Sequence, residues 1–177
     1  MATREEIIAK LDEELANLLE HYRSLSREDL ERRCTTSEVD GATPWCAKDH
    51  LAHLAMIERA FQGMIKRTIE GSSNPVGLDL KGDRDAAIAR VHQGNQDDVE
   101  AHRDDDLDTL IASLTEARDE SRRLLDSLTD EQLATPVPGA PWMDGTIGGV
   151  LLTNAHHQIQ HWKWVTEGLA SNAVTAG

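Results

Sequence analysis

Apolar residues recur at helical spacing along most of the chain. Over residues 4–24 they form one stripe, which Thr3 and Glu6 precede in a capping-box arrangement. Similar spacing predicts five further helical segments, at about 46–70, 83–102, 106–127, 129–133 and 146–169. No segment shows a convincing alternation with period two. The pattern therefore predicts an all-α protein, most simply an antiparallel four-helix bundle with an additional helical segment.

Three stretches rich in glycine, proline or threonine interrupt the helical pattern, at 33–46, 71–83 and 134–145. They are longer than the roughly 2–8 residues that usually connect helices in bundles. Such loops either line a site or cap the ends of the bundle, and their length alone favours neither role. We expect residues 1–170 to form a single domain and residues 171–177 to form a flexible C-terminal tail.

The composition excludes several classes of partner. The chain has 32 acidic and 18 basic residues, a formal charge of −14, which argues against sequence-independent binding to nucleic acid or anionic membranes. No run approaches the roughly 18–20 apolar residues that cross a bilayer. The charged N-terminal segment lacks the apolar core of a secretory signal, and two cysteines provide no disulfide framework. We therefore expect a cytoplasmic protein.

The last predicted helix has an unusual inner face. On a wheel of about 100° per residue, its two ends are apolar, whereas Asn154, His157, Gln158 and His161 lie on or beside the same face in the middle turns. His156 points the opposite way. Burying such groups without partners costs roughly 1–3 kcal/mol each. They are therefore expected to be paired, hydrated or bound to a ligand.

His157 and His161 are four residues apart, so their imidazoles can share one metal ion. Neutral imidazole suits Zn, Ni, Cu or Fe better than Mg or Ca. A third ligand would come from the second long helix. There His50 lies nearer the middle of the apolar face and His53 at its margin, so periodicity favours His50 slightly and leaves the choice open. A contribution from Cys46 is also conceivable, although an inert thiol at a helix N-terminus is the simpler interpretation.

The segment WCAKDHLAHLA, which starts at Trp45, resembles the W-x-x-K-D-x-L-x-H-L-A motif of the DinB-like superfamily, and the resemblance spans roughly residues 5–168. The HxxxH pair on the last helix is similar to the second motif of that superfamily. The resemblance implies a four-helix bundle in which His53, His157 and His161 hold a divalent metal. It also implies relatives that act as thiol-dependent transferases and isomerases, and homodimers formed through helix faces as one option.

The middle of the chain is similar to the ClbS-like branch of the superfamily, named for a colibactin-resistance protein. The similarity lies in the stretch that follows Asn95, in LLDSLTDEQL and in the PWMDG segment before the last helix. This branch implies an alternative function, a non-catalytic protein that binds a small molecule and confers resistance to it.

Three histidines would leave open positions on a zinc or nickel ion, as in catalytic metal sites. A water or a low-molecular-weight thiol could occupy them. Glu58 and Asn154 are candidate catalytic residues near this site, although Glu58 could equally form a salt bridge to a neighbouring helix. We expect a metal-dependent transferase or hydrolase that acts on a small electrophilic molecule. The alternatives are the small-molecule binding protein and a structural bundle whose histidines belong to the core.

Overall fold

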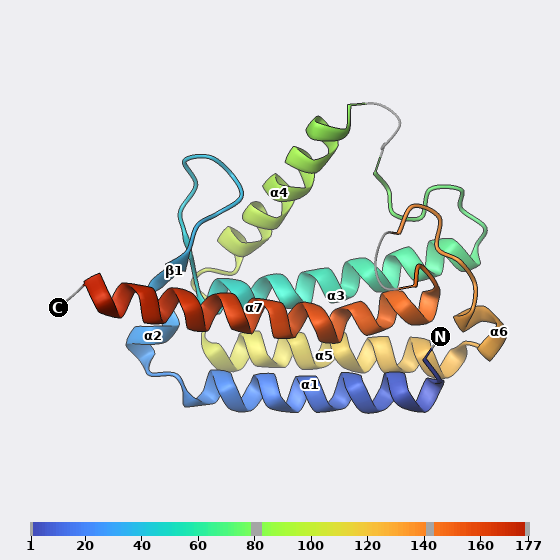
Figure 1. The fold of residues 1–177 in the computed structure, drawn as a ribbon, viewed down its shortest axis with the longest axis horizontal. Coiled ribbons are helices and arrows are strands. Elements are labelled where there is room, and N and C mark those ends of the chain that lie inside the picture. Colours follow the sequence, from blue (N-terminus) through green and yellow to red (C-terminus); the bar gives the residue numbers. More distant parts are fainter. Residues whose placement is uncertain (1, 79–82, 141–143, 176–177) are drawn as a thin grey trace.

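The computed structural model describes residues 2–78, 83–140 and 144–175, and four long helices lie side by side in it (Figure 1). They are α1 (Arg4–Ser24), α3 (Ala47–Ile69), α5 (Leu107–Ser127) and α7 (Ile147–Thr175). The shorter elements are α2 (Arg27–Glu31), β1 (Arg33–Thr35), β2 (Trp45–Cys46), α4 (Arg84–Ala101) and α6 (Asp130–Leu133). The predicted all-α bundle is confirmed.

The connection through α4 explains the directions of the four long helices. In Figure 1, α3 and α5 run the same way, while α1 and α7 run the opposite way. The chain leaves the far end of α3 and returns along α4, which leans away from the bundle, so that α5 starts beside the start of α3. Because α3 contacts α5 and α7, and α1 contacts the same two helices, the four close around a shared core. The additional helical segment expected from the sequence is therefore α4, which forms a crossover connection between the parallel helices α3 and α5.

The helix boundaries agree with the local sequence signals. Thr3 and Glu6 form the expected reciprocal capping box, in which the Glu6 amide donates to Thr3 Oγ1 (3.2 Å) and the Thr3 amide to the Glu6 carboxylate (2.8 Å). The last helix continues past its predicted end at residue 169 to Thr175. Residues 171–175, expected in the C-terminal tail, are thus helical, and residues 176–177 lie outside the described residues.

The stretch expected as a loop at 33–46 contains a small two-stranded sheet. Strands β1 and β2 pair antiparallel, with Arg33 opposite Cys46 and Thr35 opposite Trp45. Strands of two and three residues are too short for an alternating pattern to reveal them. The sheet matters for the site, because it holds Thr35 and Trp45 at the start of α3.

A polar layer divides the core into two apolar clusters. One cluster surrounds Leu11 and Ile65 and the other surrounds Leu51 and Leu114. Between them, Arg118 on α5 donates two hydrogen bonds to the carboxylate of Glu58 on α3, and both side chains are 1% exposed. A guanidinium buried in this way needs such a partner. On α7, His157 and His161 likewise lie between the residues of the two clusters.

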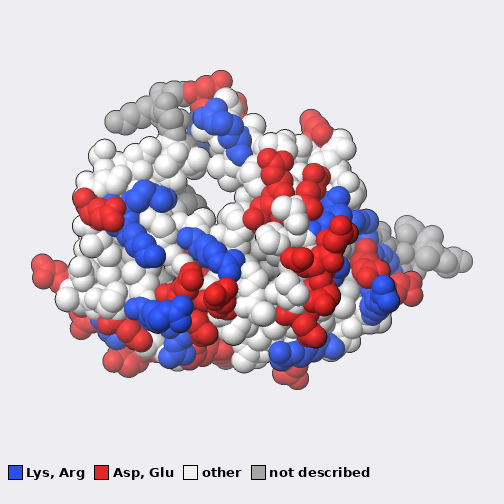
Figure 2. Space-filling view, turned by 180° about the vertical axis from the view of Figure 1, so that it is seen from behind, with Lys and Arg blue, Asp and Glu red and all other residues white. Residues whose placement is uncertain are grey.

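On the face shown in Figure 2, the surface charges do not gather into one basic region. Figure 2 shows acidic and basic side chains interspersed over the face turned away from the viewer in Figure 1. Among the residues that the structure describes, no helix has the length and apolar character needed to cross a membrane.

Candidate metal centre

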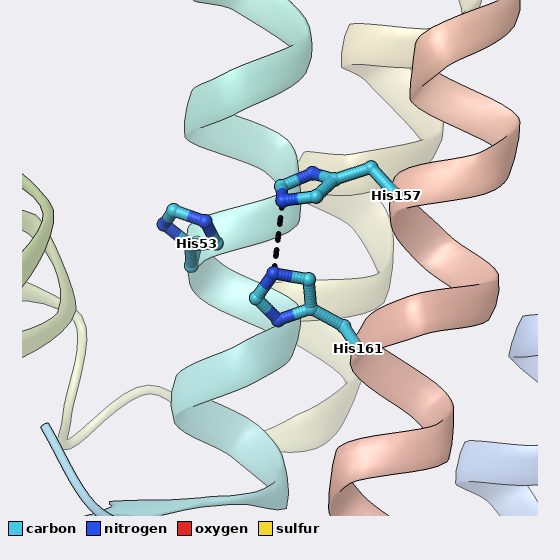
Figure 3. Close-up of side chains that lie close together, drawn as sticks. All are labelled: His53, His157 and His161. Atoms are coloured by element: carbon cyan, nitrogen blue, oxygen red, sulfur yellow. Dashed lines mark hydrogen bonds between the residues drawn. The ribbon is translucent and has the colours of Figure 1, made fainter. Parts of the chain in front are cut away.

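Three histidines from two neighbouring helices lie close together (Figure 3). His53 lies on α3, and His157 and His161 lie one turn apart on α7. One ring nitrogen of each lies within 4.8 Å of those of the other two, and the Nε2 atoms of His157 and His161 are 2.9 Å apart. No other described group of three or more His, Cys, Asp or Glu side chains brings its ligand atoms this close.

The three imidazoles are neutral in the folded chain at physiological pH. Burial lowers the pKa of His53 to about 3 and that of His157 to about 4, and it lowers the pKa of His161 as well. Neutral rings present lone pairs, which a transition metal requires. The Nδ1 atom of His53 is buried and has no hydrogen-bond partner among the described residues. An unpaired polar atom beside two further imidazoles fits a site for a divalent transition metal.

His50 also belongs to this cluster, in a different place from the three. Its ring is 2% exposed, with Nδ1 at 2.7 Å from Nδ1 of His161 and Nε2 at 2.7 Å from Oγ1 of Thr35. It therefore lies behind His161, on the side away from His157. The periodicity argument placed His50 nearer the centre of the apolar face, and its near-complete burial agrees with this position. The structure nevertheless groups His53, and not His50, with the pair on α7.

Trp45 holds the histidine rings of α3 from one side. Its indole Nε1 donates to Oε1 of Gln96 on α4 (2.9 Å), and its ring contacts those of His50 and His53 at centroid distances of 5.3 and 5.2 Å. The indole therefore ties α4 to the start of α3 and restricts the orientation of both imidazoles.

The next motif residues fix the start of α3. Lys48 donates to the carbonyl of Asp105 (2.8 Å), between α4 and α5. Asp49 is buried, accepts a hydrogen bond from the Cys46 amide (2.9 Å) and pairs with Arg33 of β1. A carboxylate in the first turn caps the helix. Lys48 and Asp49, the charged residues of the W-x-x-K-D-x-L-x-H-L-A motif, thus fix the start of the helix that carries His53.

A cavity of about 930 Å³ opens in front of the histidines. Its wall comes from β1, β2, α3, α4, α7 and the segment between the strands, so the long stretch at 33–46 does line a site. Aromatic and aliphatic surface is supplied by Trp45, Trp164, Phe61 and Ile57. The charged lining residues are Glu38 and Glu167, and no described Lys or Arg lines the wall. This size and mixed lining suit a small organic molecule.

The structure does not bring the two predicted catalytic residues to the cavity. The carboxylate of Glu58 is held by Arg118 in the polar layer, as the salt-bridge interpretation anticipated. Asn154 is 3% exposed and also absent from the cavity wall, and its Nδ2 has no partner among the described residues. Helix periodicity places a residue on the inner face, but it does not say which neighbour the side chain meets there.

The cysteines do not join the centre. Burial raises the pKa of the Cys34 thiol to about 11 and also raises that of Cys46. Both are therefore protonated at neutral pH, and a thiol is a poor metal ligand and nucleophile compared with a thiolate. Cys34 lines the cavity, whereas Cys46 is buried at the start of α3.

The comparisons with known proteins agree with this architecture. A family model of the DinB superfamily matches residues 42–165, a segment that holds all three histidines of the centre. The crystal structure of an uncharacterised protein from Escherichia coli UTI89 is similar, with a TM-score of 0.67 and 17% identity over 97% of this chain and 95% of that one. This likeness shows the shared fold. No curated protein matches the chain. The match over well over half of the sequence establishes that the chain belongs to the DinB superfamily.

Proposed function

We propose that this protein is a metal-dependent enzyme that acts on a small electrophilic molecule, as a thiol-dependent transferase or as a hydrolase. The observation that carries the proposal is the position of the three clustered histidines on the wall of a cavity of about 930 Å³. Superfamily membership supports a metal at this point. A closed structural site would be surrounded by protein instead.

His53, His157 and His161 would hold the ion, with zinc or nickel as the best matches to three neutral imidazoles. A bound divalent ion would supply Lewis-acid chemistry, which makes a water or a low-molecular-weight thiol a stronger nucleophile at neutral pH. With three protein ligands, such an ion retains room for a further group from the cavity.

The chain's own residues would bind and orient the substrate. Phe61, Ile57 and Trp164 offer apolar surface, while Asn95 and Gln160 offer amide groups at the same wall. The apolar surface excludes water from the reacting groups, and the amides can fix the orientation of polar substituents. Because no Lys or Arg lines the described wall, the bound ion itself would be the group that attracts an anionic part of the substrate or a thiolate.

One observation favours the alternative of a non-catalytic binding protein. The side chains of Glu58 and Asn154 do not reach the cavity, and the carboxylates that do, Glu38 and Glu167, have side chains 62% exposed at its wall. A cavity whose wall has no buried carboxylate among the described residues is consistent with sequestration of a molecule without its conversion.

Turnover decides between the two functions. Untagged protein is stripped with a chelator, reloaded with Zn²⁺ or Ni²⁺, and incubated with monobromobimane, a small electrophile, with and without mycothiol, bacillithiol or glutathione. The enzyme proposal expects thioether or hydrolysed product above the uncatalysed rate in the reloaded protein, and loss of that rate in His157→Leu. Binding of one molecule per chain without product, for this and for epoxide and activated-ester electrophiles, would favour sequestration. His156 is exposed but also lines the cavity, so the control for turnover is His102→Leu, at an exposed histidine that is absent from the cavity wall.

A further inference from the structure

The cluster contains a chain of hydrogen-bonding groups that leads away from the candidate metal ligands. We propose that His50 and Thr35 are positioning residues, which together fix the ring nitrogen that His161 presents to the metal. This inference rests on the proposed metal site and assigns two further residues to it.

The chain runs through three contacts in series. Nε2 of His161 lies 2.9 Å from Nε2 of His157, and Nδ1 of His161 lies 2.7 Å from Nδ1 of His50. Nε2 of His50 then lies 2.7 Å from Oγ1 of Thr35. Each ring nitrogen of His50 and His161 thus has one partner, and both rings are at most 3% exposed.

A neutral imidazole carries one N–H, so the protons along this chain depend on one another. If Nδ1 of His161 donates, Nδ1 of His50 must accept, and Nε2 of His50 must carry the hydrogen and donate to Thr35. If the order is reversed, Nε2 of His161 carries the hydrogen and cannot bind a metal. Only the first order leaves the lone pair of His161 Nε2 directed at His157 and the metal centre.

Thr35 is suited to its place at the end of the chain. A hydroxyl can accept from His50 and still donate its own hydrogen, and Thr35 lines the cavity, so a group bound there can accept that hydrogen. Strand pairing with Trp45 fixes the backbone of Thr35, and Gly168 on α7 lets β1 approach closely. The Thr35 hydroxyl therefore stabilises the arrangement of hydrogens in which Nε2 of His161 can bind the metal, and it leaves the centre open to the cavity.

The test measures Co²⁺ affinity by competition with a chelator, together with the visible absorption of the bound ion, in untagged variants checked for folding by thermal unfolding. We expect His50→Leu to weaken binding about 10–100-fold, as loss of such partners does in other metal sites. His50→Asn places an amide oxygen near the position of Nδ1 and should recover part of the affinity. Thr35→Val should weaken binding by a smaller factor and Thr35→Ser should not, while His156→Leu serves as the control.

A direct readout is the imidazole ¹⁵N spectrum of the Zn²⁺-loaded protein. The proposal expects the hydrogen on Nδ1 of His161 and on Nε2 of His50. If the wild type binds Co²⁺ but Thr35→Val and a folded His50→Leu bind it with unchanged affinity and spectrum, or if the ¹⁵N spectrum shows the opposite tautomer of His50, the positioning role is wrong. If His50→Leu does not fold, Thr35→Val and the ¹⁵N spectrum still decide. Failure of the wild type to bind Co²⁺ would contradict the proposed function instead.

Discussion

Oε1 of Glu58 accepts a 2.6 Å hydrogen bond from Nε of Arg118, between helices α3 and α5 and away from the cavity. The guanidinium also donates to the second carboxylate oxygen and to the backbone carbonyl of Leu11 on α1. One arginine thus joins three of the four long helices. From this pair we predict a structural role for Glu58 in place of acid–base catalysis.

Loss of one partner of this ion pair should destabilise the bundle without emptying the metal centre. Arg118→Leu leaves the Glu58 carboxylate buried and unpaired, so we expect the free energy of unfolding to fall by about 3–5 kcal/mol. Urea unfolding measures the change, and metal analysis of the folded fraction should match wild type.

The double variant Glu58→Leu/Arg118→Leu provides the control for Arg118→Leu. It removes both charges, so it should be more stable than the single variant. A single variant as stable as wild type would contradict the structural role, and a stable Glu58→Gln variant that retained metal but lost turnover would return Glu58 to the mechanism.

Gly168 should tolerate no side chain. A Cβ at this position of α7 would lie 2.0 Å from the carbonyl oxygen of Cys34, so β1 would have to move away from the helix. Gly168→Ala is expected to cost about 1–3 kcal/mol of stability through overpacking. It should also weaken Co²⁺ binding, because β1 carries the hydroxyl of Thr35.

Gly94 on α4 is the matched control for Gly168. A Cβ there meets no neighbouring atom within 4 Å, so Gly94→Ala should be neutral or stabilise the protein by roughly 0.5–1 kcal/mol. Equal effects of the two substitutions in thermal and urea unfolding would show that the contact between β1 and α7 is not tight.

The metal-free protein should lose stability as the pH falls below 6.5. Burial lowers the pKa of His50 and His157 to about 4 and that of His53 to about 3, from 6.5 in an exposed histidine. Between these values the unfolded chain binds more protons than the folded chain, so the free energy of unfolding rises with pH. The contribution of these histidines to that free energy reaches its full value above about pH 6.5.

Urea unfolding of chelator-treated protein from pH 7 to pH 5 tests this dependence, in a window above the usual carboxylate range. The free energy of unfolding should rise less steeply with pH in His53→Leu/His157→Leu, which lacks two of the titrating groups. His156→Leu should retain the wild-type slope. A wild-type stability that stays constant over the window would show that the histidines are not held neutral by burial.

The sequence predicted the long helices closely, because their apolar stripes and caps are local signals. Thr3 marks the first helix, and the structure starts α1 at Arg4. The path between α3 and α5 was not predictable in the same way, since a crossover depends on how α4 packs and not on its own weak periodicity. The short strands were missed because two or three residues cannot establish an alternating pattern.

The candidate site was only partly predictable for similar reasons. The i,i+4 spacing of His157 and His161 is a local feature, and the resemblance to a known family supplied His53. Spacing on α3 alone could not show whether His50 or His53 joins the pair on α7, because both side chains are buried. The two differ in the side chains that each ring contacts on α7. The roles of Thr35 and Arg118 depend on contacts between distant segments, which no pattern within one helix encodes.

The central claim is that His53, His157 and His161 hold one divalent metal ion, and metal stoichiometry tests it most directly. Untagged wild-type protein is exposed to Zn²⁺ and to Ni²⁺, freed of excess ion and measured by elemental analysis beside His53→Leu, His157→Leu, His161→Leu and the control His156→Leu. We predict about one ion per chain in wild type and in the control, and little retained metal in each of the other three. Equally negligible metal in all five proteins would contradict the claim, and so would full occupancy in the three triad variants.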